Sequence, residues 1–218
     1  MYEDLSLYIN GQFLKEGGRK TSDVVNPATD EIIGKLPHAG QADLDLALTS
    51  AQKAFESWRK TSPIEKSRIL RKVAELSRAR AQEIGRNMTL DMGKPLAESA
   101  GEVMVCSEHA DWAAEECRRI YGRIVPARAD GVRQMVLREP IGVVAAFSPW
   151  NFPYNQAIRK IVSALGAGCT VIIKGPEDAP SALVAIARMF HEAGLPPGCL
   201  NVVWGVPSEV STYLINSP

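Results

Sequence analysis

The second half of the chain alternates short apolar runs with amphipathic stretches. Apolar runs bounded by glycine or proline predict buried strands, and the stretches between them carry apolar residues at helical spacing. An alternating order of strands and helices implies right-handed crossovers and a parallel sheet that is buried on both faces. The predicted elements are the strands Ile141–Phe147, Thr170–Lys174 and Leu200–Val203, and the helices Pro153–Leu165, Pro180–Ala193 and Pro207–Ile215.

The first half has a different pattern. LYINGQF contains an Asn-Gly pair, which is a strong hairpin signal, and VVNPATDEIIGKLP repeats the order of strand, turn and strand. Three amphipathic helices are predicted to follow: Ala42–Trp58, Pro63–Ile84 behind a Ser62 cap, and a third from about Pro95 to Tyr121. The glutamates of the third helix are expected mostly to face water. They are Glu98, Glu102, Glu115 and Glu116.

Beyond Gly122 and Pro126 the segment VRQMVLREPIGV is predicted to be extended, with Val132, Met135 and Leu137 as buried positions. The change of pattern after it suggests two parts. Residues 1–139 hold hairpins, helices and this extended segment, and residues 140–218 hold three strands of a parallel sheet with their helices.

Composition narrows the possible partners. The 218 residues are 45% hydrophobic, and Lys+Arg 25 balances Asp+Glu 25, so no global field attracts nucleic acid or an acidic membrane. Small molecules and further copies of the chain are the expected partners. The N-terminus lacks the basic and apolar regions of a secretory signal, and no apolar run approaches the ~20 residues of a membrane helix, so a cytoplasmic location is expected.

The four cysteines and three histidines are scattered, which argues against a metal site. Cys106 and Cys117 are separated by about three helical turns and are interpreted as core residues of one helix face. Cys169 is interpreted as a packing residue at the start of a strand. Cys199 follows a Pro-Pro-Gly loop and could be an accessible thiol, although no nearby histidine makes it a nucleophile.

The usual dinucleotide fingerprint GxGxxG is absent from the first strand-to-helix turn, which reads FSPWNFP instead. Gly166-Ala167-Gly168 precedes a strand and is interpreted as a helix-to-strand turn. Topology alone is therefore a weak argument for a nucleotide cofactor.

Three motifs supply a stronger argument: PWNFP at 149–153, Lys174-x-x-Glu177, and AGLPPG at 193–198. With them the chain resembles the aldehyde dehydrogenase superfamily, with a leaning toward succinate-semialdehyde dehydrogenases. The resemblance implies an α/β fold in which a β-hairpin and a three-helix segment precede an incomplete Rossmann-type parallel sheet. Residues 140–218 are then expected to be the first three strands of a dinucleotide-binding domain. It also implies that the N-terminal hairpin and the extended segment near Val132 belong to an oligomerisation sheet of a homo-oligomer.

The resemblance further implies NAD-dependent oxidation of an aldehyde to its acid. Family members are roughly twice this length, so the nucleophilic cysteine and the catalytic glutamate are expected after Pro218, and the 218-residue chain alone is expected to be inactive. Two alternatives stay open: a short protein that binds dinucleotide or oligomerises without catalysis, and an enzyme that transfers the acyl group to coenzyme A.

Site residues follow from the same motifs. At the end of a strand, Lys174 can donate to ribose hydroxyls and Glu177 can accept from them. The Glu177 carboxylate would also repel the 2′-phosphate of NADP, so NAD is the expected cofactor and NADP the less favoured one. The usual Lys-Pro-Ser/Ala-Glu is replaced by Lys-Gly-Pro-Glu, and Ala179 stands where relatives cap the next helix with threonine, which predicts a weaker cap. The remaining cofactor contacts are predicted at Phe147, Ser148, Pro149, Trp150 and Gly205, with Trp150 as a core residue in the alternative.

Asn151 is the predicted catalytic residue of this chain. An amide N–H held near an aldehyde oxygen stabilises the negative charge that develops there when a thiolate attacks the carbonyl carbon. The alternative is that Asn151 only caps the helix that starts near Pro153.

Overall fold

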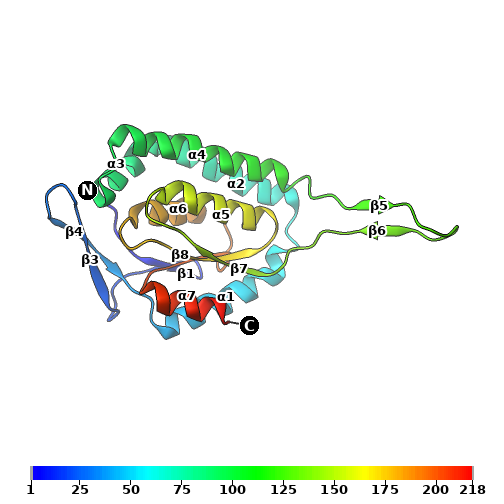
Figure 1. Cartoon of the computed structure of the whole chain (residues 1–218), viewed down its shortest axis with the longest axis horizontal. Coiled ribbons are helices and arrows are strands. Elements are labelled where there is room, and N and C mark those ends of the chain that lie inside the picture. Colours follow the sequence, from blue (N-terminus) through cyan, green and yellow to red (C-terminus); the bar gives the residue numbers. More distant parts are fainter. Residues whose placement is uncertain (1, 218) are drawn as a thin grey trace.

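A five-stranded sheet forms the centre of the molecule in the computed structural model, which describes residues 2–217. Its strand order is β2-β1-β9-β8-β7 (Figure 1). The three strands β7 (Val143–Phe147), β8 (Thr170–Lys174) and β9 (Leu200–Val203) are parallel, as predicted. Every residue of β8 and β9 is buried, which explains why both strands are mostly apolar and do not alternate apolar with polar residues.

Helices cover both faces of the sheet (Figure 1). The crossovers are α5 (Pro153–Gly166) and α6 (Ser181–Glu192), and α7 (Pro207–Ile215) follows β9. Helix α5 packs on β7 and β8 and α6 packs on β9, while α1 (Gln41–Trp58) lies against the same three strands. The predicted parallel α/β arrangement is confirmed.

The N-terminal hairpin belongs to this central sheet. Strand β1 (Leu7–Ile9) pairs with β2 (Gln12–Leu14) and also antiparallel with β9, through Tyr8 opposite Val202. The turn residues Asn10 and Gly11 both have positive φ, as the Asn-Gly signal predicts. The hairpin therefore does not share a sheet with the extended segment near Val132, which forms a separate two-stranded pair, and a role of the hairpin between subunits stays a prediction. All three residues of β1 are buried, so the strand extends the sheet at its β9 edge.

In the part of the chain that the structure describes, four helices and not three precede the parallel strands. After α1 come α2 (Pro63–Ala79), α3 (Ala81–Met92) and α4 (Leu96–Glu116). The predicted helix Pro63–Ile84 is broken at Arg80, whose φ of −108° and ψ of 10° leave the helical range. Apolar periodicity missed the break because Leu76 before it and Ile84 after it are both buried. The third predicted helix ends at Glu116, short of Tyr121.

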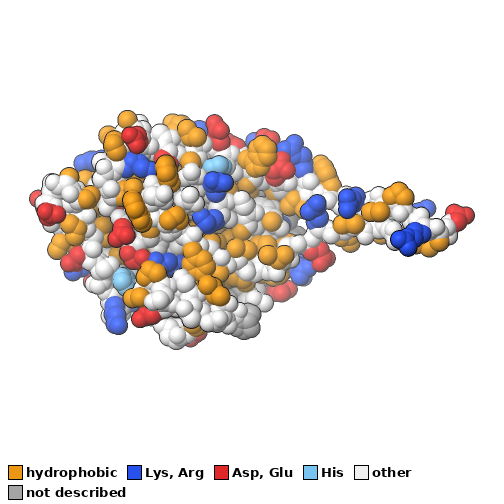
Figure 2. Space-filling model, viewed as in Figure 1, with side chains coloured by type: hydrophobic (Ala, Val, Ile, Leu, Met, Phe, Trp, Pro, Cys, Tyr) orange, Lys and Arg blue, Asp and Glu red, His pale blue; other side chains and the backbone are white. Residues whose placement is uncertain are grey.

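A ribbon of two strands, β5 (Arg123–Val125) and β6 (Gln134–Val136), extends away from the body (Figures 1 and 2). The prediction that Val132, Met135 and Leu137 are buried is wrong, since they are 53%, 69% and 74% exposed. The reason is that within residues 2–217 no second layer packs on the ribbon. A second two-stranded pair, β3 (Thr21–Val25) with β4 (Ile32–Pro37), lies at the opposite end of the molecule.

Core residues from both predicted parts of the chain form one cluster, in which α2, α3 and α4 pack over α5 and α6. The boundary between residues 139 and 140 stays a prediction. Over residues 2–217, none of the helices combines the length and the apolar character that crossing a membrane requires.

Candidate functional site

The carboxyl ends of β7, β8 and β9 meet at one edge of the sheet, where open α/β sheets bind their ligands. Backbone hydrogen bonds join the loops that leave them. The N–H of Ser148 donates to the carbonyl of Lys174 over 3.0 Å, and the N–H of Gly175 donates to the carbonyl of Val203 over 3.2 Å. These hydrogen bonds fix the backbone that carries the polar residues predicted at this edge.

Lys174, Glu177 and Gly205 form one polar cluster. The Lys174 Nζ lies 2.5 Å from Glu177 Oε2, and the N–H of Gly205 donates to Glu177 Oε1 over 3.0 Å. The structure thus brings together three of the predicted cofactor residues. The φ of +146° at Gly205 is a conformation that a side chain rarely adopts, so the carboxylate contact depends on a glycine there.

Trp204 explains the unusual Lys-Gly-Pro-Glu sequence and was missed in the sequence. A Cβ on Gly175 would lie 2.0 Å from the Trp204 ring and 2.7 Å from Leu183. Trp204 is fully buried, and its indole N–H donates to the carbonyl of Ser6 over 3.0 Å. The signal in the sequence was the large aromatic residue directly before Gly205. A buried ring beside a tight loop requires a small residue opposite it, and that residue is Gly175.

The loop between β7 and α5 places Asn151 at the surface. Ser148 is buried, whereas Pro149, Trp150, Asn151 and Phe152 are exposed. Within residues 2–217 the side-chain amide of Asn151 has no hydrogen-bond partner, and α5 has Phe152 at its N-cap position without a side-chain cap. The alternative in which Asn151 caps α5 is therefore wrong, and so is a core position for Trp150, which is 56% exposed.

The four cysteines are buried and free of disulfides. The expectation that Cys199 could be accessible is wrong, because its loop folds inward and its thiol is fully enclosed. Burial raises the pKa of Cys199 to about 12 and that of Cys106 to about 11, and burial also raises the pKa of Cys117. These thiols are protonated at neutral pH and do not provide a thiolate nucleophile.

A buried carboxyl group caps α6 from another helix. Asp91 of α3 accepts from the N–H of Ser181 and from the hydroxyl of Tyr2, each over 3.0 Å. This contact replaces the cap that Ala179 cannot supply, so the predicted weakness is compensated. Burial raises the pKa of Asp91 to about 7, and the bonds from Ser181 and Tyr2 offset part of that effect.

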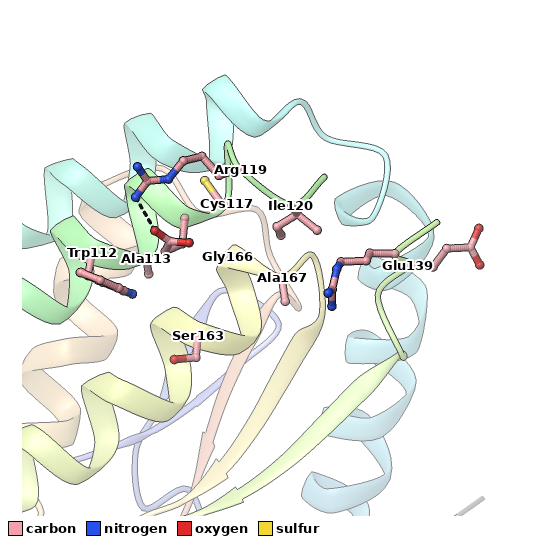
Figure 3. A pocket seen from close by; sticks show the side chains of 11 residues that line it. Trp112, Ala113, Cys117, Arg119, Ile120, Glu139, Ser163, Gly166 and Ala167 are labelled. Atoms are coloured by element: carbon pink, nitrogen blue, oxygen red, sulfur yellow. Dashed lines mark hydrogen bonds and ion pairs between the residues drawn. The ribbon is translucent and has the colours of Figure 1, made fainter. Parts of the chain in front are cut away.

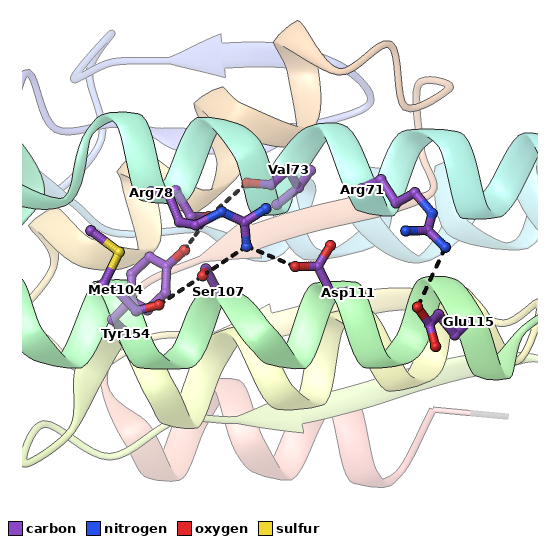
Figure 4. Close-up of polar contacts among 9 residues, drawn as sticks. Arg71, Val73, Arg78, Met104, Ser107, Asp111, Glu115 and Tyr154 are labelled. Atoms are coloured by element: carbon purple, nitrogen blue, oxygen red, sulfur yellow. Dashed lines mark hydrogen bonds and ion pairs between the residues drawn. The ribbon is translucent and has the colours of Figure 1, made fainter.

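Helix α5 is tied to the helices above it by a second polar group (Figure 4). The Tyr154 hydroxyl donates to Ser77 Oγ of α2 over 2.5 Å, and Ser77 Oγ donates to the carbonyl of Val73 over 2.7 Å. Beside them, Arg78 reaches Asp111 of α4 over 2.7 Å. Tyr154 is buried just after the exposed loop, which it therefore anchors at its helical end.

A cavity of about 560 Å³ lies at the other end of α5 (Figure 3). Its lining includes Trp112 and Arg119 from the α4 region, Glu139 behind the β5–β6 ribbon, and Gly166 and Ala167. A second cavity, of about 540 Å³, is lined by Gly205 together with residues of α1 and α7. Neither is lined by Asn151, Lys174 or Glu177.

The fold is that of an α/β protein whose parallel strands carry a polar cluster at their carboxyl edge. The family model described as "Aldehyde dehydrogenase family" matches residues 13–218. This chain belongs to the aldehyde dehydrogenase family, an oxidoreductase family that uses NAD or NADP.

Individual relatives agree with that assignment. Glutarate-semialdehyde dehydrogenase of Pseudomonas putida is 41% identical over 95% of this chain and 43% of its own length. An NADP(+) succinate-semialdehyde dehydrogenase of Escherichia coli is 38% identical over 96% of the chain and 44% of its length. The leaning toward semialdehyde dehydrogenases is confirmed at this level of similarity, and the chain spans less than half the length of these relatives.

Solved structures show the same fold. The crystal structure of an E. coli NADP-dependent enzyme superposes with a TM-score of 0.96 at 37% identity, over 99% of this chain and 45% of that one. The NAD+ complex of a Bacillus cereus aldehyde dehydrogenase superposes with a TM-score of 0.93 at 32% identity, over 99% of this chain and 44% of that one.

Proposed function

We propose that this chain is the front part of an NAD-dependent aldehyde dehydrogenase that oxidises a semialdehyde to the carboxylic acid. The observation that carries the proposal is the joint position of Asn151 behind β7 and of the Lys174–Glu177–Gly205 cluster behind β8 and β9. Semialdehydes are proposed because they are the named substrates of the glutarate and succinate enzymes that the chain is similar to.

The polar groups of the cluster suit a ribose diol. Within the described residues, the Lys174 ammonium uses one of its three N–H donors, on Glu177. The Glu177 carboxylate accepts two hydrogen bonds and has lone pairs for about two more. Its side chain is 23% exposed and can therefore be reached by a ligand. A donor and an acceptor held 2.5 Å apart can bind the two neighbouring hydroxyls of one ribose.

The same cluster favours NAD over NADP. The 2′-phosphate of NADP would meet the Glu177 carboxylate, and two like charges at contact are unfavourable. Lys174 neutralises part of the Glu177 charge, so we expect a preference for NAD over NADP of about tenfold rather than complete exclusion of NADP. The succinate-semialdehyde dehydrogenase of Escherichia coli to which the chain is similar uses NADP(+), so the activity is measured with both dinucleotides.

Asn151 is proposed to bind the aldehyde oxygen. Its amide is exposed and unpaired within residues 2–217, so it can donate to an oxyanion without giving up another bond. A bound nicotinamide would accept the hydride. This chain would hold the dinucleotide through Lys174 and Glu177 and stabilise the oxyanion through Asn151. The nucleophile is proposed to be a residue outside 1–218, because the thiols of this chain are buried.

The test uses the full-length protein with glutarate and succinate semialdehydes and either NAD or NADP, with and without coenzyme A. Reduction of the nicotinamide without coenzyme A is expected. Asn151→Ala should lower kcat roughly ten- to a thousand-fold, the scale of one oxyanion donor, and leave NAD affinity nearly unchanged. Strict dependence on coenzyme A would refute hydrolysis to the acid, and unchanged kcat in Asn151→Ala would remove the role given to Asn151.

A further inference from the structure

Two charged residues from outside the loop hold the backbone at Asn151 and just after it. Lys94 lies between α3 and α4, and Glu102 lies in the second turn of α4. Their side chains are only 11% and 4% exposed, and Lys94 Nζ lies 2.5 Å from Glu102 Oε2. The expectation that Glu102 faces water is wrong, because this pairing keeps its charge compensated inside the protein.

Glu102 fixes the start of α5. Its Oε1 accepts from the N–H of Asn155 over 3.0 Å. Asn155 is the third residue of α5, so this N–H is one of those that a helix leaves unpaired in its first turn. Because the local N-cap residue Phe152 has no side-chain cap, α4 supplies the negative group that the α5 N-terminus favours.

Lys94 fixes the loop residue itself. Its ammonium donates to the carbonyl oxygen of Asn151 over 3.1 Å and lies 4.0 Å from the centre of the Phe152 ring. One cation therefore contacts the backbone of Asn151 and the side chain that follows it. Together these contacts hold the peptide between residues 151 and 152, and the orientation of that peptide sets the direction in which the Asn151 side chain leaves the backbone.

We propose that Lys94 and Glu102 are positioning residues for the Asn151 amide. This inference rests on the proposed function of Asn151. The pair acts through geometry, since its two charges compensate each other and Lys94 touches the Asn151 carbonyl rather than its amide. Fixing a donor in advance is a main source of the stabilisation that oxyanion contacts give, and a misplacement of about 1 Å can cost a hundredfold in rate.

The expected effects have an upper bound. A residue that acts only through Asn151 cannot cost more than removal of the Asn151 amide. Glu102→Gln and Lys94→Met should each lower kcat roughly tenfold, with KM for the dinucleotide unchanged, because Lys174 and Glu177 are held by separate contacts. Lys94→Arg keeps the charge and its donors and should recover much of the rate.

The experiment is a double-mutant cycle in the full-length enzyme. Glu102→Gln and Lys94→Met are each measured alone and combined with Asn151→Ala, with kcat, KM for the dinucleotide and the melting temperature as readouts. Glu98→Gln is the matched control, because Glu98 lies one turn earlier on α4 and is exposed. The proposal predicts that neither substitution lowers kcat further once the Asn151 amide is absent.

The outcomes distinguish the role of Lys94 and Glu102 from the role of Asn151. If Asn151→Ala lowers kcat and Glu102→Gln lowers it by the same factor in both backgrounds, positioning is refuted while the oxyanion role of Asn151 remains. If Asn151→Ala has wild-type kcat, the proposed role of Asn151 fails and the inference fails with it. If Glu102→Gln does not fold, the effect of Lys94→Met on kcat is compared with and without Asn151→Ala in the same way. This substitution removes the ammonium group that contacts the Asn151 carbonyl.

Discussion

Replacement of Asp91 by Asn is predicted to stabilise the protein at neutral and alkaline pH and to do so less in acid. The carboxyl group of Asp91 is buried, bonded to Tyr2 and to the N–H of Ser181, and no ion pair of the described chain includes it. Its pKa is raised from 3.8 to about 7, with burial as the main cause. The folded protein therefore holds this proton more tightly than the unfolded chain does.

Proton linkage at Asp91 gives the direction and the size of the change in the free energy of unfolding with pH. Between about pH 4 and pH 7 the folded state binds more protons at this site than the unfolded state, so the free energy of unfolding falls as the pH rises through this window. At about 1.4 kcal/mol for each unit of pKa, the loss reaches roughly 4 kcal/mol above pH 7, which is an upper value since the protein can relax around the charge. Asparagine carries no such proton and keeps an oxygen for the Ser181 N–H.

The assay compares melting temperatures of wild type and Asp91→Asn in the full-length protein across this pH window. The difference in favour of Asp91→Asn should grow by several degrees as the pH rises. Asp43→Asn is the control. Burial raises the pKa of Asp43, but the bonds from Arg19 and the Gly40 N–H outweigh this and lower it, so Asp43 stays ionised throughout the window. Parallel profiles for wild type and Asp91→Asn would refute the reasoning, and a wild type that gains stability with rising pH would reverse it.

Three further predictions concern the strand-edge site and the thiols. Glu177→Gln keeps an oxygen for the Gly205 N–H but removes the charge, so the ratio of kcat/KM for NAD over NADP should fall roughly tenfold; a wild type that already prefers NADP would contradict this. Gly175→Ala places a Cβ 2.0 Å from the Trp204 ring and should cost about 1–3 kcal/mol and weaken dinucleotide binding, whereas Gly101→Ala, with open space around its Cβ, should be neutral or stabilising in the same denaturation and binding assays. Residues 1–218 expressed alone should show no aldehyde-dependent NADH formation, because burial raises the pKa of Cys106, Cys117 and Cys199; measurable turnover would show that a nucleophile lies within this chain.

Local signals in the sequence determined the parallel strands, their crossover helices and the first hairpin. The apolar centre of TVIIK occurs because both faces of β8 are covered, and the Asn10-Gly11 pair supports the positive φ values that its turn needs. The motifs PWNFP and Lys174-x-x-Glu177 also identified the family and the edge of the sheet where its polar residues gather. In each case the information lies within a few neighbouring residues.

Tertiary structure decided what depends on residues far apart in the chain. Pairing of β1 with β9, burial of Glu102 beside Lys94, and the cap that Asp91 gives to α6 each join distant segments, and no local period encodes them. The same holds for Val132, Met135 and Leu137, whose apolar pattern predicts burial but cannot say which surface would cover them. The sequence could therefore indicate that Asn151 has a role, whereas only the packing of α4 against the loop shows which residues hold its backbone in place.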